Sequence, residues 1–369
     1  MMKLTHTICP SCSVGCGINL INKDQKVVGT YPYKRHPVNE GKNCLRGRES
    51  FKVLGEKTRL TTPLLRKGNL VDSDWEEVLN LAAEKIRSYK GDEIGIIASG
   101  NCTNEECEIL KKFADALEVE NIGYNNHNFP NFDFETGTLE DLENSQFILV
   151  IGDILKDNPL MGRRIILARE NGAFIIAADF PEKTTTGINA DEYVQIKSIR
   201  EFLDKLDPEI QSKLDEHSTI VVGKLDHKKE LDDLYQIASK SNSKLIPVMD
   251  DCNSRGAMNI LPALDTDDLK VLVESVKLLY VVGDDPVSYT EESFKNLDFL
   301  ITQSPTINNT TLSSDVVLSG ACWAEKSGSF TNSTGNIQKI QQIIPVAGDA
   351  QDDVVIIQKI AEKLNKIVR

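Results

Sequence analysis

Short apolar runs alternate with amphipathic segments over most of this chain. The runs that predict strands are 93–99, 147–153, 174–179, 219–223, 245–249, 278–283, 299–302 and 316–318. Continuous apolar runs of this length are typical of parallel strands that are covered on both faces. Between them, segments such as 75–86 repeat their apolar residues with the 3.6-residue period of a helix. The alternation predicts an α/β protein with more than one doubly wound sheet.

The first 57 residues follow a different pattern, of short strands and polar loops. Segments 17–21 and 26–30 predict a hairpin, and a second hairpin is predicted over 64–71. Near the other end of the chain, 353–367 predicts an amphipathic helix. The one long polar stretch, 124–138, is expected to be a linker.

Composition and charge narrow the class of protein. The chain has 369 residues, with 42 basic and 56 acidic side chains and a net charge of −14, so nucleic acid and anionic membranes are poor partners. No apolar run approaches the roughly 18 residues that cross a bilayer, and the N-terminus has neither an apolar signal segment nor a twin arginine. The eight cysteines then favour metal binding in a reducing cytoplasm over disulfides.

Half of the cysteines form one motif, with the spacing C-x2-C-x3-C-x27-C. They are Cys9, Cys12, Cys16 and Cys44. Four thiolates are soft ligands that hold an iron–sulfur cluster or zinc. The uneven spacing differs from the paired knuckles of structural zinc, and Gly15, Gly17 and Gly47 would let backbone amides approach cluster sulfurs. The motif favours a [4Fe–4S] cluster; zinc and four unrelated buried thiols are the alternatives.

Several predicted strands end in a glycine that is followed by an acidic or amide residue. These pairs are Gly100-Asn101, Gly152-Asp153 and Gly283-Asp284. In open α/β sheets, ligands bind beyond the carboxyl ends of the strands, where glycine lets backbone amides approach phosphates. The pairs therefore suit a nucleotide-like cofactor, although glycine after a strand is also an ordinary turn. The usual NTP and NAD fingerprints are absent from the sequence.

Collinear blocks of the sequence resemble the molybdopterin (bis-MGD) oxidoreductase family. Besides the cysteine motif, the blocks are 36–41, 138–143, 150–153 with 158–159, 252–257 and 315–338. Within that family, the chain looks like the α subunit of formate dehydrogenase and the large iron–sulfur subunit of complex I. The resemblance implies a small N-terminal [4Fe–4S] domain and doubly wound, mostly parallel sheets of the formate dehydrogenase/DMSO reductase type, domains I to III.

The resemblance also implies a division of the chain. Residues 1–57 would form the cluster domain, with 319–340 packed against it, and 58–140 with 209–318 would form an α/β domain. Residues 141–208 would form a second, shortened α/β domain, followed by a C-terminal helix within 341–369. The formate dehydrogenases continue into a β-barrel domain that covers the cofactor, which this sequence is expected to lack.

Site residues carry over from the family residue by residue. The four motif cysteines would ligate the cluster, and Arg46 stands where the family often has a lysine that bridges cluster and pterin; a surface cation is the alternative. The residues expected near the pterin and the cluster domain are Glu325, Gly328, Thr331 and Asn332. Those expected near the phosphates or guanine of molybdopterin guanine dinucleotide are Gly152, Asp179 and Gly283.

The sequence also departs from the family. The loop 125–134, where family enzymes carry a cysteine or selenocysteine ligand of molybdenum or tungsten, contains no cysteine. His127 in this loop is a weak candidate ligand, and the alternative is a solvated or capping histidine. Cys102 and Cys107, at the opening of a predicted helix, suit core packing better than metal binding. Segment 197–201 replaces the family's Lys-Pro-Gly-Thr-Asp for guanine recognition.

Three functions remain open. The first is an electron-transfer subunit of a cytoplasmic oxidoreductase complex, with ferredoxin-like, flavin or hydrogenase-type partners. The second is a catalytic Mo- or W-dependent formate or formylmethanofuran dehydrogenase subunit, whose β-barrel lid is a separate chain. The third is a non-redox assembly scaffold with a structural cluster.

Overall fold

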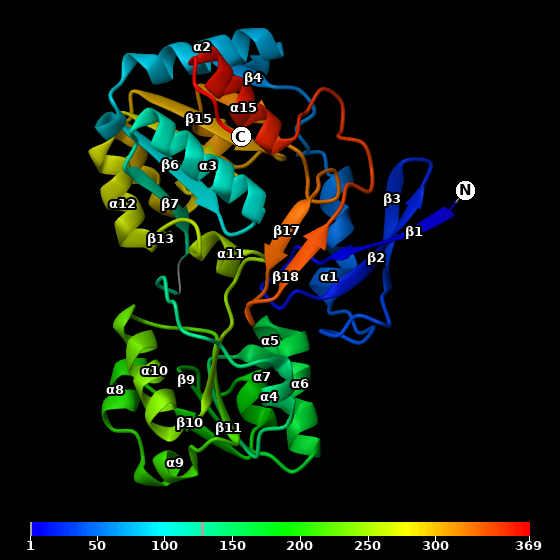
Figure 1. Ribbon diagram of the computed structural model, residues 1–369, viewed down its shortest axis with the longest axis vertical. Helices are drawn as coiled ribbons and strands as arrows, with labels where there is room; N and C mark the ends of the chain where they lie inside the picture. The colour runs from blue at the N-terminus through cyan, green and yellow to red at the C-terminus, as the bar shows by residue number, and fades with distance from the viewer. Residues whose placement is uncertain (1, 127–128) are drawn as a thin grey trace.

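Two α/β halves and a small N-terminal sheet make up the molecule. The computed structural model describes residues 2–126 and 129–369. Figure 1 shows one half above the other, with the N-terminal sheet projecting to one side of both. This arrangement confirms the predicted α/β class and the separate N-terminal unit.

The upper half is built on an eight-stranded sheet. Its strands, in spatial order, are β13 (Ala263–Leu264), β7 (Asn121–Asn125), β6 (Ile94–Ser99), β14 (Leu278–Val282), β15 (Phe299–Ser304), β16 (Val316–Ser319), β4 (Leu64–Lys67) and β5 (Asn69–Asp72). The first six are parallel, and the β4–β5 hairpin adds an antiparallel edge. Helices cover both faces, so the apolar runs of the strands are buried on both sides.

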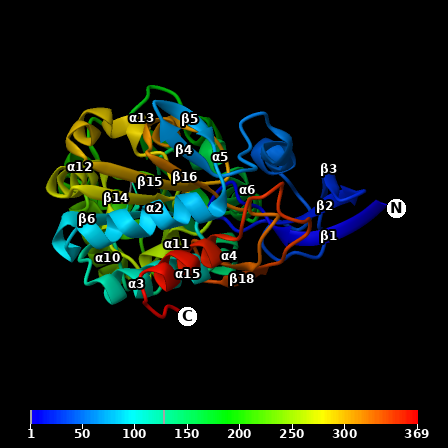
Figure 2. The same cartoon turned by 90° about the horizontal axis from the view of Figure 1, so that it is seen from above.

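The helices of the upper half follow the expected amphipathic pattern. They are α2 (Trp75–Ser88), α3 (Asn104–Leu117), α11 (Ser254–Met258), α12 (Thr266–Ser275), α13 (Val287–Thr290), α14 (Asn309–Ser313) and α15 (Asp353–Lys363), with 3-10 turns η2 (Gly91–Glu93) and η3 (Glu291–Asn296). Seen from above, α2 and α15 lie side by side (Figure 2). They share one apolar core with α3, whereas α12 packs on the opposite face of the sheet.

The lower half contains a five-stranded parallel sheet. Its order is β10 (Glu192–Gln195), β9 (Phe174–Asp179), β8 (Phe147–Ile151), β11 (Ser218–Val222) and β12 (Lys244–Pro247). Its helices are α4 (Leu139–Glu143), α5 (Ile154–Asp157), α6 (Pro159–Glu170), α7 (Thr185–Asn189), α8 (Ile199–Asp204), α9 (Pro208–Lys213) and α10 (Lys229–Ser241).

One expected boundary is wrong. The expected division places all of 209–318 in the upper domain, but β11 pairs with β8 and β12 pairs with β11, so both strands belong to the lower sheet. The apolar runs correctly predict both strands. Such a run does not specify its neighbour in the sheet, because every buried parallel strand has the same pattern.

The N-terminal unit is a three-stranded antiparallel sheet with two short helical turns. It consists of β1 (Met2–Ile8), β2 (Gly17–Lys23), β3 (Lys26–Pro32), α1 (Leu45–Glu49) and η1 (Ser50–Gly55). Asp24 and Gln25, both with positive φ, form the predicted hairpin turn between β2 and β3. A hairpin from the end of the chain, β17 (Gly328–Thr331) and β18 (Ile337–Ile340), lies beside β1 (Figure 1).

The stretch expected to be a polar linker, 124–138, is largely packed against the two halves. Phe129 and Phe134 are buried. The ring of Phe134 stacks between those of Phe132 and Tyr235, with centroid distances of 4.4 and 4.5 Å. Tyr235 belongs to α10, so aromatic contacts join this segment to the lower half. The polar residues between the phenylalanines made the hydrophobic pattern of this segment look like that of an exposed linker.

A buried ion-pair triad joins three distant segments of the upper half. Lys326 Nζ lies 2.6 Å from Glu106 Oε1 of α3 and 3.2 Å from Asp353 Oδ2 of α15. The three side chains are at most 10% exposed. Because a buried charge without a partner is costly, each member keeps the others in place.

The triad predicts a specific pH dependence of stability. Burial is the main cause that raises the pKa of Glu106 from 4.5 to about 7. Between these two pKa values the native state binds a proton that the unfolded state does not, so the free energy of unfolding should fall as pH rises through this interval. Glu106→Gln should remove this part of the fall in urea unfolding at several pH values. Glu108→Gln, on the exposed side of the same helix, is the control, and an unchanged pH profile in Glu106→Gln would contradict the assignment.

Candidate metal centre

Four cysteines line one cavity at the base of the N-terminal sheet. Cys9, Cys12 and Cys16 lie on the loop between β1 and β2, and Cys44 caps the N-terminus of α1. The loop is closed by a hydrogen bond from Cys9 N to Cys16 O of 2.8 Å. The three loop thiols are buried, whereas Cys44 is half-buried. All four motif cysteines thus line the same cavity, and their role as cluster ligands stays a prediction.

Two glycines lie close to this cavity. Gly47 N donates to Cys44 Sγ at 3.4 Å, and a Cβ on Gly47 would lie 3.4 Å from Cys9 Sγ. Gly15 has φ of +76°, and its Cβ would lie 2.2 Å from Gln338 Oε1. The first glycine lets a backbone amide face a sulfur, and the second lets the cysteine loop turn beneath the β17–β18 hairpin.

Two residues that the sequence analysis did not assign clamp the backbone next to Cys16. Asn39 accepts from Gly17 N at 2.8 Å and donates to Gly17 O at 3.0 Å. His36 Nδ1 also accepts from Gly17 N, at 3.1 Å. Burial lowers the pKa of His36 to about 4, so the ring is neutral and keeps this acceptor at pH 7. Both residues belong to the block 36–41 that resembles the family, but their positions in the sequence do not indicate that they bind Gly17.

The β17–β18 hairpin holds the cysteine loop from the other side. Ser333 N donates to Ser13 O at 2.8 Å, and Gln338 Nε2 donates to Gly15 O at 2.8 Å. Asn332 Nδ2 makes a longer contact, 3.4 Å, with Val14 O. The carbonyls of three successive loop residues therefore have partners in a hairpin more than 300 residues away.

The electrostatics of the cavity favour neutral thiols unless a cation is bound. Burial raises the pKa of Cys9 to about 12 and that of Cys16 well above its usual range, and the neighbouring cysteines add to both shifts. The thiols would thus stay protonated on their own, whereas bound metal stabilises thiolates. Burial also raises the pKa of Cys12, although the nearby charge of Arg46 lowers it in part.

The residues expected near the dinucleotide lie on two different sheets. Gly152 and Asp179 follow β8 and β9 of the lower sheet, and Gly283 follows β14 of the upper sheet. The amides of both glycines are already bonded, Gly152 N to Ala178 O at 3.0 Å and Gly283 N to Gln303 O at 2.9 Å. Burial raises the pKa of Asp179, whose carboxylate accepts from the adjacent Phe180 N at 2.8 Å.

The residues expected near both pterin and cluster domain mainly anchor the β17–β18 hairpin and its approach. Glu325 pairs with Arg59. A Cβ on Gly328 would lie 2.8 Å from Glu105 Oε2 of α3, and Thr331 N donates to Asn253 Oδ1 at 2.6 Å. These contacts tie the hairpin to the upper half, and Asn332 ties it to the cysteine loop.

The remaining candidates are placed as follows. Arg46 donates through its guanidinium to the carbonyl of Asp157, which ends α5 in the lower half. Cys102 and Cys107 are buried in the core of the upper half. His127 lies outside the described residues. Gly283 lines a cavity together with Pro10 of the cysteine loop, so one end of the upper sheet reaches the metal centre.

Comparison with known families agrees with this geometry. The molybdopterin oxidoreductase Fe4S4 domain matches residues 2–54, and the molybdopterin oxidoreductase model matches residues 59–201 and 234–363. The chain belongs to the molybdopterin oxidoreductase family. The first match supports a [4Fe–4S] cluster, and the second supports a molybdopterin cofactor.

Among its relatives are α subunits of formate dehydrogenases. The F420-dependent formate dehydrogenase subunit alpha of Methanocaldococcus jannaschii is 32% identical over 98% of this chain and 70% of its own length. The F420-dependent formate dehydrogenase 2 subunit alpha of Methanococcus maripaludis is 29% identical with the same coverage. The putative formate dehydrogenase YrhE of Bacillus subtilis is 24% identical over 98% of this chain and 49% of its own length.

The aligned span also shows where this chain is shorter. The match to the M. jannaschii subunit extends over 475 residues, more than the 369 of this chain, so that relative has additional residues inside the matched region. Acetylene hydratase from Pelobacter acetylenicus superposes with a TM-score of 0.70 at 14% identity, over 98% of this chain and 69% of its own. That likeness establishes the shared fold, as the resemblance predicted.

The two cofactors differ in how well the described residues fit them. The cluster has four convergent thiols, a sulfur-facing amide and a clamped loop, so the cavity fits it. For a dinucleotide, the amides of Gly152 and Gly283 are engaged within the sheets. An acidic residue follows each glycine: Asp153 accepts from Thr186 N at 2.7 Å, and Asp284 accepts from Tyr289 Oη at 2.9 Å. These two amides are therefore not free for phosphates in this arrangement of the backbone, and the expected dinucleotide contacts stay predictions.

Loss of one cluster ligand should remove the metal centre. Cys12→Ser should abolish the visible absorbance of the anaerobically purified protein and lower its iron content, because ligand binding also stabilises the N-terminal fold. Cys107→Ser, a substitution of a buried cysteine in the upper core, should keep both. Full iron in Cys12→Ser would show that the ligands are misassigned.

The packing at Gly15 gives a second test. Gly15→Ala should lower the free energy of unfolding by about 3 kcal/mol or more, because a steric clash adds to the cost of positive φ. Gly68→Ala is a matched control, since Gly68 has φ of +85° but no heavy atom within 4 Å of its Cβ position. It should lose only about 1 kcal/mol. Equal losses in denaturant unfolding would mean that the contact with Gln338 does not constrain the loop.

Proposed function

We propose that this chain is the cluster-bearing electron-transfer subunit of a formate dehydrogenase-like oxidoreductase complex in a reducing cytoplasm. The [4Fe–4S] cluster supplies one-electron transfer when it is bound. The observation that carries the proposal is that four cysteines line one cavity, whereas the loop 125–134 contains no cysteine.

The cluster side is supported by contacts that hold every part of the cysteine loop. Asn39 and His36 fix Gly17, and the β17–β18 hairpin fixes Gly15. A loop with these constraints changes little in geometry when the charge of its cluster changes. Its reorganisation energy is therefore small, which favours electron transfer. The free state of all eight cysteines supports a reducing compartment.

The catalytic side lacks groups that turnover would need. The loop 125–134 contains no cysteine to ligate molybdenum or tungsten. Within the described part of that loop, Phe129 and Phe134 are buried. Arg46 donates to a backbone carbonyl, so we assign it a role in joining the cluster domain to α5 and, through its effect on Cys12, in the charge balance of the cluster.

A catalytic formate dehydrogenase subunit is the second candidate. It is favoured by relatives that are α subunits of F420-dependent formate dehydrogenases. In that case a molybdopterin would bind between the halves, and another chain, such as a small β-barrel subunit, would complete its enclosure. In either case we expect further redox subunits as partners. Among the described residues, the helices are too short or too polar to span a membrane.

Metal analysis with redox titration tests the relay function. Anaerobically purified protein should contain about four irons per chain, as a [4Fe–4S] cluster on four thiolates requires, and should be reduced and reoxidised reversibly without formate oxidation. Stoichiometric molybdenum or tungsten with formate-dependent reduction of the cluster would instead establish the catalytic function. A cluster that no reductant reduces would contradict both.

A further inference from the structure

Positive charge is concentrated in the part of the chain that carries the cluster cysteines. Residues 1–57 contain ten Lys or Arg and four Asp or Glu, a formal charge of +6. The whole chain has a net charge of −14, so the remaining residues are strongly acidic. Such an asymmetry creates a directional field that attracts an anionic partner to one end of the molecule.

Several of these cations surround the most accessible cluster ligand. Cys44 is half-buried, whereas the other three ligands are buried. Lys42 and Arg48 flank it in sequence and are exposed, and Arg48 N donates to Cys44 O at 3.0 Å. Lys34 is also exposed, and the Cβ position of Gly41 lies 2.9 Å from Lys34 Cα, which places Lys34 against the segment leading to Lys42.

These cations are not neutralised within the chain. Lys34, Lys42 and Arg48 form no ion pair with any side chain in 2–126 or 129–369 that the structure describes. The nearby acidic residues are already paired: Glu40 with Arg163 at 3.0 Å, and Glu49 with Lys52 at 2.7 Å. Unpaired surface charge of one sign steers association with a partner of the other sign.

An exposed apolar residue lies between two of these cations in the sequence. Leu45 directly follows Cys44 and is 65% exposed. An apolar centre with a charged, solvent-accessible rim is the usual composition of a protein interface. Electron-transfer encounters are typically small and weak, so a patch of this size is sufficient for them.

We propose that the surface formed by Lys34, Lys42, Leu45 and Arg48 docks a small acidic protein that carries single electrons. The inference rests on the proposed relay function and adds the chemistry of the partner. On docking, one electron passes from the reduced centre of the partner to the cluster behind Cys44. The partner is oxidised by one electron, the cluster is reduced by one electron, and no bond forms or breaks.

The test is the rate at which an acidic carrier reduces the cluster. A reduced plant-type [2Fe–2S] ferredoxin serves as the probe in anaerobic stopped-flow experiments with the full-length holoprotein. The second-order rate constant should fall about tenfold or more as the NaCl concentration rises from about 0.05 to 0.5 M, because salt screens the steering. The double variant Lys42→Glu with Arg48→Glu should lower the low-salt rate constant by about tenfold.

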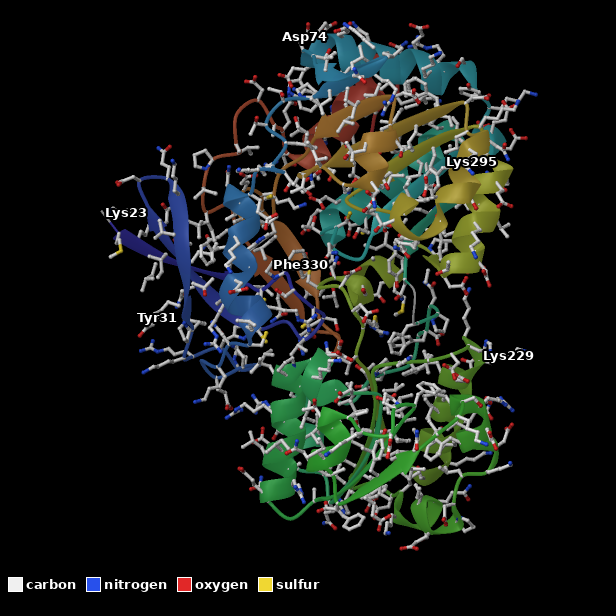
Figure 3. The ribbon with its side chains drawn as sticks, turned by 180° about the vertical axis from the view of Figure 1, so that it is seen from behind. Lys23, Tyr31, Asp74, Lys229, Lys295 and Phe330 are labelled. Atoms are coloured by element: carbon white, nitrogen blue, oxygen red, sulfur yellow. The ribbon has the colours of Figure 1, made fainter. Side chains whose placement is uncertain are left out.

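A matched control reverses the same amount of charge elsewhere. Lys229 and Lys240 are exposed on α10, in the lower half (Figure 3 labels Lys229). Lys229→Glu with Lys240→Glu should keep the wild-type rate constant, and all variants should keep the visible spectrum of the cluster.

The outcomes separate the docking surface from the relay function. If dithionite fails to reduce the wild-type cluster, the relay function is wrong and the docking inference falls with it. If dithionite reduces every variant to the same extent but the ferredoxin rate depends on neither salt nor Lys42 and Arg48, only the docking surface is wrong. The surface could also fail as a ferredoxin site and serve another partner. If the double variant keeps the wild-type ferredoxin rate but loses salt-sensitive self-association, the surface binds a second copy of this chain. If it instead loses binding to phosphatidylserine vesicles, the surface binds a membrane.

Discussion

The buried convergence of four thiols is the constraint on which the rest of the structure depends. Protonated thiols in an apolar cavity gain little from one another, and thiolates there would repel, so the cavity is stable in its functional form only with a bound cationic centre. The surrounding contacts follow from this requirement. Gly47 turns an amide toward sulfur, Asn39 and His36 hold Gly17, and Gln338 holds Gly15.

The same constraint links the two ends of the chain. The β17–β18 hairpin is anchored to α3 and to Asn253 on one side and contacts the cysteine loop on the other. Lys326 of the buried triad lies just before this hairpin and ties its start to Glu106 of α3 and Asp353 of α15. The N-terminal sheet therefore depends on residues beyond 320 for its rigidity, although it looks like a separate domain in the sequence.

Local patterns predicted local features well. The spacing of Cys9 to Cys44 predicted one ligand set, whose members line one cavity. The apolar runs located β6, β8, β9, β11, β12, β14, β15 and β16 to within two residues but missed β7. Thr103 and Glu106 form a capping box at the start of α3, in the S/T-x-x-E pattern that a sequence can show. These features are encoded over a few residues, where side-chain chemistry and backbone geometry act directly.

Features that depend on distant partners were not predictable from one sequence. Nothing in the segment around β11 indicates that its neighbour is β8, and nothing in the spacing of His36 and Asn39 indicates that they bind Gly17. Polar and aromatic residues mixed in 124–138 concealed the stack of Phe134 on Tyr235 of α10. In each case the decisive contact joins residues that only the tertiary fold brings together.

Iron quantification combined with EPR of the reduced, anaerobically purified protein measures the central property most directly. A [4Fe–4S] cluster held by the four cysteines predicts about four irons per chain and a paramagnetic signal that appears on one-electron reduction and disappears on reoxidation. A colourless protein that contains zinc instead of iron and gives no such signal would contradict it.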